Sequence, residues 1–116
     1  LADEGISLAV YDARFAKPVD LELLERLIGG DVPILTVEDH HLIGGFGACV
    51  IEACHDRGLS TAGIHRLGLP DGWIYQGSRG QQLAEAGIDA AAIAERARRI
   101  VHSLPRIAAK TRLRAG

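Results

Sequence analysis

The sequence has no methionine and few aromatic residues: one tryptophan, two tyrosines and two phenylalanines among 116 residues. Its apolar share of 47% is therefore carried mainly by alanine, leucine, isoleucine and valine. This composition favours helices packed on a small sheet over an aromatic-rich β-sandwich. The length allows one domain with a single modest core.

Cysteine is equally scarce. Cys49 and Cys54 are five positions apart, which fits neither a CxxC redox motif nor a zinc knuckle. Both lie in a mostly apolar, helix-type segment, which predicts buried free thiols in a reducing compartment. No apolar run is long enough to span a membrane, and no signal-peptide pattern occurs. The sequence thus predicts a soluble cytoplasmic protein with no membrane partner.

Acidic charge dominates all but the C-terminal end. Residues 106–116 carry four positive charges and no acid, so the remaining residues carry −6 of a total net charge of −2. An acidic body argues against nucleic acid as a partner. We interpret residues 1–105 as the domain and residues 106–116 as a basic, solvated tail.

Residues 34–50 are the most informative segment. A short β-branched run ends at Glu38 and Asp39, a loop follows, and glycines at 44, 45 and 47 lead into a helical apolar pattern. This order is typical of a parallel strand whose carboxyl end opens onto a helix N-terminus, where α/β proteins collect ligands and partners.

The rest of the chain alternates strand and helix patterns. Asp20, Ser78 and Asp89 are expected helix caps, with Gln81 completing a capping box. The expected strands are residues 5–11, 33–37 and 64–69, and the expected helices are residues 20–29, 45–57, 78–87 and 89–104. Crossovers of this length predict an open, mainly parallel sheet in a three-layer α/β/α arrangement.

Several residues are candidates for a site. Glu38 and Asp39 would cap the next helix or contact a neighbouring domain or subunit, and general acid–base chemistry is the weaker alternative. Asp39, His40 and His41 could form a metal site, although a solvated loop is the simpler interpretation. Gly44, Gly45 and Gly47 could cradle an anion or allow close packing of helix on sheet.

Two further features have the same double reading. Trp73, near Tyr75 after a Pro-Asp-Gly break, is either a core plug or an interface anchor. Arg14 and Lys17 would form a salt bridge with Glu38 across the sheet edge or contact a phosphate. The possible interface or anion-contact residues are Glu38, Asp39, His40, Gly44, Gly45 and Trp73.

An ordered set of segments resembles the C-terminal domain of transketolase-class thiamine-diphosphate enzymes. The set begins with ARFAKPVD at 13–20, TVED at 36–39 and GGFG at 44–47. GLPDGWI at 68–74, then GS, QL and GID at 77–78, 82–83 and 87–89, resemble the 1-deoxy-D-xylulose-5-phosphate synthases in particular. The resemblance covers residues 5 to about 104 and implies a domain that here lacks its first strand and helix.

The resemblance implies an enzyme that joins pyruvate to glyceraldehyde 3-phosphate with release of carbon dioxide, for isoprenoid, thiamine and pyridoxal synthesis. It places thiamine diphosphate and Mg²⁺ between the first two domains, held by a Gly-Asp-Gly segment that this chain lacks. No catalytic, cofactor or metal residue is therefore carried onto this chain, which alone should be inactive. Its partners would be the enzyme's other domains and a second subunit of a homodimer.

Two departures and two alternatives stay open. The His40-His41 pair and the tail after Pro105 are not features that we expect in the family that the chain resembles. The chain could instead be the corresponding domain of a 2-oxo-acid dehydrogenase β subunit. An independent module that binds a small anion at residues 44–47 is the alternative of a different class.

Overall fold

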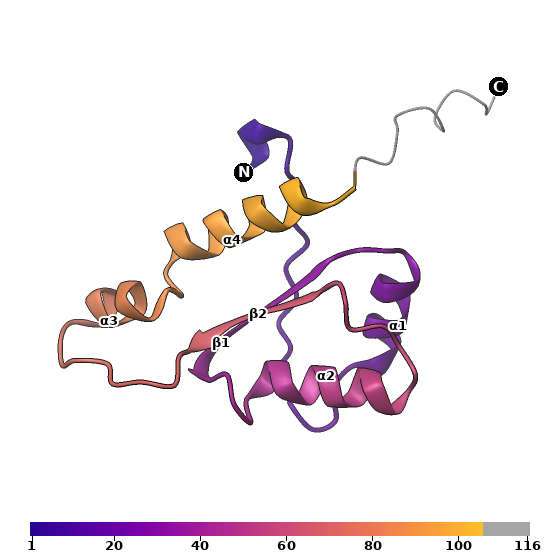
Figure 1. The fold of residues 1–116 in the computed structure, drawn as a ribbon, viewed down its shortest axis with the longest axis horizontal. Helices are drawn as coiled ribbons and strands as arrows, with labels where there is room; N and C mark the ends of the chain where they lie inside the picture. The colour runs from indigo at the N-terminus through magenta and orange to yellow at the C-terminus, as the bar shows by residue number, and fades with distance from the viewer. Residues whose placement is uncertain (106–116) are drawn as a thin grey trace.

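A parallel two-stranded sheet with helices on both faces organises the chain (Figure 1). The structure, a computed structural model, describes residues 1–105. The elements in chain order are the 3-10 turn η1 (Ala2–Glu4), α1 (Leu21–Gly29), β1 (Ile34–His41), α2 (Phe46–Asp56), β2 (Ile64–Leu69), α3 (Arg79–Ala86) and α4 (Ala90–Ser103). None of the helices in this described part is long and apolar enough to cross a membrane.

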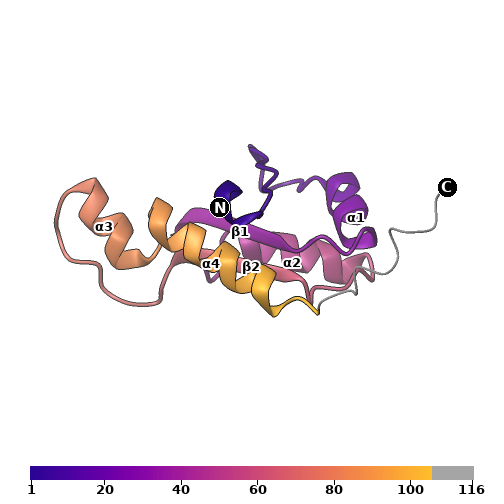
Figure 2. The same cartoon turned by 90° about the horizontal axis from the view of Figure 1, so that it is seen from above.

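The sheet pairs β1 with β2 through the crossover helix α2. Ile34 is in register with Ile64 and Val37 with Leu67, and an irregularity separates these pairs from the last one, His41 with Leu69. Helix α2 lies on one face of the sheet and α4 on the other (Figures 1 and 2). The parallel α/β layering expected from the sequence is confirmed, and β1 extends beyond the predicted residues 33–37.

The helix starts follow the capping residues of the sequence. The Asp20 carboxylate accepts from the Leu23 amide at 3.0 Å, and the Asp89 carboxylate accepts from the Ala92 amide at 2.9 Å. At α3, both halves of the predicted capping box between Ser78 and Gln81 are present. These caps satisfy backbone donors that a helix cannot pair internally, so they fix where each helix begins.

The main core lies where α1 and α2 meet the sheet. Leu24, Val50 and Cys54 are buried there, and partly buried apolar side chains surround them. An Arg57–Glu25 ion pair of 3.2 Å joins the outer surfaces of the same two helices. On the α4 side, Ala97 and Ile100 are buried.

The expected strand at residues 5–11 is wrong. The structure shows no strand there, and the exposed fractions of Leu8 and Val10 are 54% and 91%. The Arg98 guanidinium donates to Glu4 at 2.9 Å and ties η1 to α4. The following chain runs from the α4 side of the sheet to the α2 side before α1, rather than along β1 (Figure 1). A strand-type pattern forms a strand only where the path of the chain lays it alongside a sheet edge, and this segment crosses the sheet instead (Figure 1).

The two cysteines differ in burial. Both are free, as expected, but only Cys54 is buried; the prediction that Cys49 is buried is wrong, because it is only partly covered. Five residues of helix place the two side chains roughly 140° apart around the axis, so Cys49 leaves the stripe that faces the core. Burial raises the pKa of the Cys54 thiol.

We therefore expect thiol labelling to separate the two cysteines. A bulky maleimide should modify Cys49 quickly and Cys54 only as the protein opens, because Cys54 is covered and its thiolate is disfavoured. Peptide mass spectrometry over time gives both rates, with urea-unfolded protein as the control. Equal rates in the native protein, or a mass two daltons low, would contradict this arrangement.

A second prediction concerns the tie between η1 and α4. The hydrogen bond from Arg98 lowers the pKa of Glu4, so the pair stabilises the fold above the ordinary glutamate pKa and loses this effect as pH falls through the lowered folded value. Glu4→Gln should therefore lower the thermal midpoint slightly at pH 7. The difference from wild type should disappear in acid. A difference that persists in acid would assign the effect to packing instead of charge.

Candidate functional site

The carboxyl end of β1 delivers a buried carboxylate to the first turn of α2. The Glu38 side chain is 8% exposed, and its Oε2 accepts from the Gly47 amide at 2.8 Å. Residue Gly45, the N-cap of α2, has no side chain to do this. Glu38 thus caps the helix from the neighbouring strand, and its charge faces the positive end of the helix dipole.

The glycines at 44–47 make room for this contact. Gly44 has a φ of 72°, in the left-handed region that favours glycine. A Cβ at Gly45 would overlap Glu38 Oε1 and the His41 carbonyl, and one at Gly47 would lie 2.7 Å from Thr36 Oγ1. The close-packing interpretation is therefore the one that the geometry supports. The position that an external anion would take already holds the Glu38 carboxylate, which would repel it.

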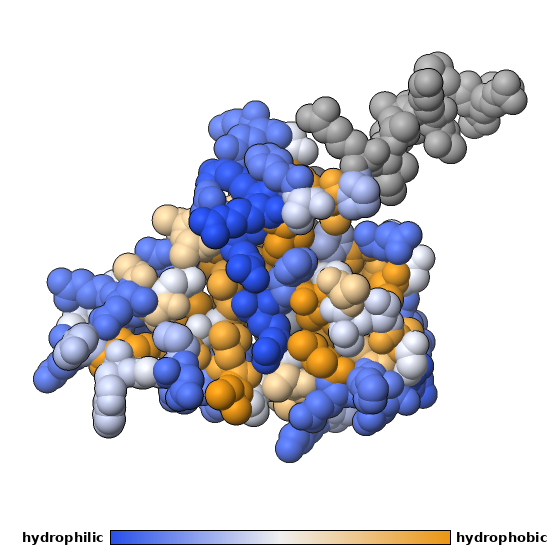
Figure 3. All heavy atoms as spheres, in the orientation of Figure 1, coloured by the Kyte–Doolittle hydropathy of each residue, from blue (hydrophilic) through white to orange (hydrophobic). Residues whose placement is uncertain are grey.

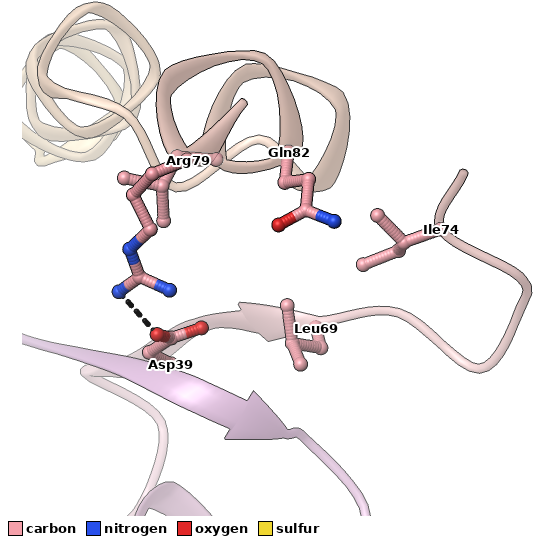
Figure 4. Close-up of a pocket in the computed structure, with 6 residues that line it drawn as sticks. Asp39, Leu69, Ile74, Arg79 and Gln82 are labelled. Atoms are coloured by element: carbon pink, nitrogen blue, oxygen red, sulfur yellow. Dashed lines mark ion pairs between the residues drawn. The ribbon is translucent and has the colours of Figure 1, made fainter. Parts of the chain in front are cut away.

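The second carboxylate forms a different contact. Asp39 is paired with Arg79, the first residue of α3 (Figure 4). Around this pair lies a hollow of about 210 Å³ between the end of the sheet and α3, with Leu69, Ile74, Gln82 and Leu83 completing its lining. Sequence reasoning missed Arg79, although its place beside the Ser78 cap, after the carboxyl end of β2, was a signal.

The histidines do not assemble a metal site. His40 and His41 are exposed, their ring centroids are 6.2 Å apart, and His40 Nδ1 lies 3.0 Å from the His41 carbonyl oxygen. Among residues 1–105, no group of three or more His, Cys, Asp or Glu side chains could hold a metal ion. The expected loop is wrong at these positions, because Asp39, His40 and His41 form the exposed last residues of β1.

Other predicted contacts are corrected. Arg14 lies 3.5 Å from Asp12 and not against Glu38, and no ion pair joins Lys17 to Glu38 in the described part. Both sit on the loop before α1, which Figure 1 places away from the carboxyl ends of the strands. Trp73 is 95% exposed and Tyr75 is 78% exposed, so the core-plug interpretation of Trp73 is wrong.

The described residues do not fit a magnesium diphosphate. The one helix start with a glycine cradle is filled by the Glu38 carboxylate, and Asp39 is neutralised by Arg79. General acid–base chemistry also lacks support, since neither carboxylate faces a second reactive group that the structure holds in place. Both carboxylates of this edge are engaged within the domain itself.

The fold is that of a small parallel α/β domain. At the carboxyl end of its sheet, Glu38 and Asp39 bind groups of the same domain. Residues 1–93 match the family model described as transketolase, C-terminal domain. The chain belongs to the transketolase C-terminal domain family.

Its similar relatives are bacterial synthases. The chain is 45% identical over 101 residues to the 1-deoxy-D-xylulose-5-phosphate synthase of Geobacillus thermodenitrificans. The aligned residues are 87% of this chain and 16% of that protein. The chain is 41% identical over 103 residues to the synthase of the same name from Bacillus mycoides, covering 89% of this chain and again 16% of that protein. The chain thus spans about one sixth of the length of these relatives.

The packing of Glu38 against α2 gives a stability test. Gly45→Ala should destabilise the fold by about 1–3 kcal/mol, because the new methyl group overlaps the Glu38 carboxylate and a backbone carbonyl. Gly80→Ala is the matched control, since nothing lies within 4 Å of its Cβ position and it sits in α3. This control should gain about 0.5–1 kcal/mol. Urea unfolding measures both, and equal shifts would contradict the packing at Gly45.

Proposed function

We propose that this chain is the C-terminal domain of a 1-deoxy-D-xylulose-5-phosphate synthase. The observation that carries the proposal is the 45% identity to a synthase of that name over 87% of the chain. The complete enzyme would join pyruvate to glyceraldehyde 3-phosphate with release of carbon dioxide, supplying precursors of isoprenoids, thiamine and pyridoxal. We place it in the cytoplasm, in keeping with the free thiols at Cys49 and Cys54.

In this proposal the domain supports the enzyme and takes no part in its chemistry. Thiamine diphosphate and Mg²⁺ would bind outside residues 1–116, because the described residues offer neither a metal cluster nor an open anion cradle. Glu38 joins β1 to the first turn of α2, and Asp39 forms an exposed ion pair with the first residue of α3. The role of the domain would be to pack against the other domains and to help hold a homodimer.

The test compares two proteins. The complete gene product, supplied with thiamine diphosphate and Mg²⁺, should form 1-deoxy-D-xylulose 5-phosphate and carbon dioxide from pyruvate and glyceraldehyde 3-phosphate. The 116-residue chain should give no turnover under the same conditions, because the two carboxylates at the end of β1, Glu38 and Asp39, are already paired with Gly47 and Arg79. Product formation is followed by chromatography and carbon dioxide by a coupled assay.

Two results would count against the proposal. Turnover by the 116-residue chain would show that the reaction takes place within this domain, which contradicts its proposed supporting role. A complete gene product that decarboxylates 2-oxo acids only with a second kind of subunit would indicate a 2-oxo-acid dehydrogenase instead. The upstream reading frame supplies a further control, since the synthase requires a Gly-Asp-Gly segment there.

A further inference from the structure

Three large apolar side chains stand in solvent at the carboxyl edge of the sheet. Ile43 is 75% exposed on the loop after β1, while Trp73 and Tyr75 are 95% and 78% exposed on the loop after β2. Both loops leave the sheet beside the paired residues His41 and Leu69. We call these three side chains the carboxyl-edge patch. Figure 3 shows that apolar surface also reaches solvent elsewhere on the face it displays.

Hydrogen bonds from α3 reach the loop that carries the two aromatic rings. The Tyr75 amide donates to Glu85 Oε1 at 3.5 Å, and the Tyr75 carbonyl accepts from Gln82 Nε2 at 3.4 Å, so two long, exposed hydrogen bonds connect its main chain to α3. Ile74, which lies between Trp73 and Tyr75 in the sequence, lines the hollow beside α3 (Figure 4). The loop therefore turns Ile74 inward and leaves Trp73 and Tyr75 outside.

The fold itself gains almost nothing from Trp73. A ring that is 95% exposed contributes little burial, yet it is the only tryptophan in the chain. Tryptophan and tyrosine on a preorganised surface are the side chains that anchor protein contacts, because they bury a large area at low entropic cost. Trp73 and Tyr75 thus have the side chains of an interface anchor and are exposed in the described structure.

The size of the patch indicates the kind of surface that it would contact. Two aromatic rings bury roughly 150–250 Å² each and the isoleucine adds less, so the patch offers about 400–600 Å². A stable complex of separate proteins buries about 800 Å² per partner. A patch below that size is sufficient when a tether raises the effective concentration to the millimolar range.

Resting on the proposed function, we propose that the carboxyl-edge patch docks this domain onto the remainder of its own polypeptide. The relatives are about six times as long as the matched segment, so most of the enzyme is available in cis. The complementary surface is an apolar hollow that takes the Trp73 ring and presents a hydrogen-bond acceptor to its indole N–H. The Asp39–Arg79 pair lies beside it as part of a polar rim.

Hydroxyl-radical footprinting of the complete gene product tests this contact. Peptide mass spectrometry follows oxidation of Trp73, normalised to the same peptide in unfolded protein. Oxidation should be at least tenfold slower in the complete gene product than in the 116-residue chain, and dilution should not change it. Equal oxidation rates in the two proteins would overturn the proposal.

Cross-linking identifies the occupant. The photoreactive residue p-benzoylphenylalanine at Tyr75 should give a product with the mass of one polypeptide, joined to a peptide outside residues 1–116. A product of twice that mass would assign the patch to a second copy, and absence of a cross-link would leave it without a partner; both results overturn the proposal.

Variants supply the energetic test. In the complete gene product Trp73→Ala should lower the thermal midpoint, and Trp73→Phe should restore most of it. Val32→Ala is the matched control, since Val32 is 46% exposed just before β1, at the opposite edge of the sheet. In the 116-residue chain Trp73→Ala should leave the midpoint unchanged. An equal drop of the thermal midpoint in both proteins would show that Trp73 stabilises the domain itself, and would overturn the docking role.

The synthase assay on the same preparation separates the two proposals. If the complete gene product is an active synthase and its Trp73 is oxidised as fast as in the 116-residue chain, the docking proposal is wrong and the proposed reaction stands. A complete gene product that protects Trp73 but lacks synthase activity rejects the proposed reaction alone.

Discussion

The buried carboxylate of Glu38 holds together the junction between β1 and α2. It accepts the Gly47 amide, and Gly45 and Gly47 lack side chains where β1 and α2 approach each other. Arg66 on β2 completes the junction, because its guanidinium donates to the Leu42 carbonyl at 3.0 Å. The Gly47 amide satisfies Glu38 Oε2, while Glu38 Oε1 is buried and has no hydrogen-bond partner among the described residues. The burial of this carboxylate is therefore only partly compensated. The contact fixes the first turn of α2 against the end of β1, where Phe46 packs against the main core.

This use of the carboxylates shapes what the domain can do. In many α/β proteins the carboxyl edge of the sheet is where a ligand binds. Here Glu38 fills the helix start and Asp39 pairs with Arg79, so the edge presents fixed loops and exposed aromatic rings in place of an open charged cleft. An edge of this kind agrees with the contact role that we propose for the domain.

Local signals were the most predictable part of the fold. Asp20, Ser78 and Asp89 were expected to cap helices and do so, because capping depends on residues within three positions of each other. The strand at residues 64–69 was also predictable from its pattern. Residues 5–11 have an equally strong strand pattern, yet they form no strand, because their path does not lay them along either outer edge of the two-stranded sheet.

At the candidate site, the sequence identified Glu38, Asp39 and the glycines but left their roles open. Only the tertiary structure decided that Glu38 caps α2, that Arg79 reaches Asp39 across about forty positions, and that Trp73 stands in solvent. The sequence by itself determined the helix starts, the parallel crossover and the family resemblance, since these depend on short-range order along the chain. Contacts between distant residues and the exposure of a ring depend on how the elements pack, which no local pattern records.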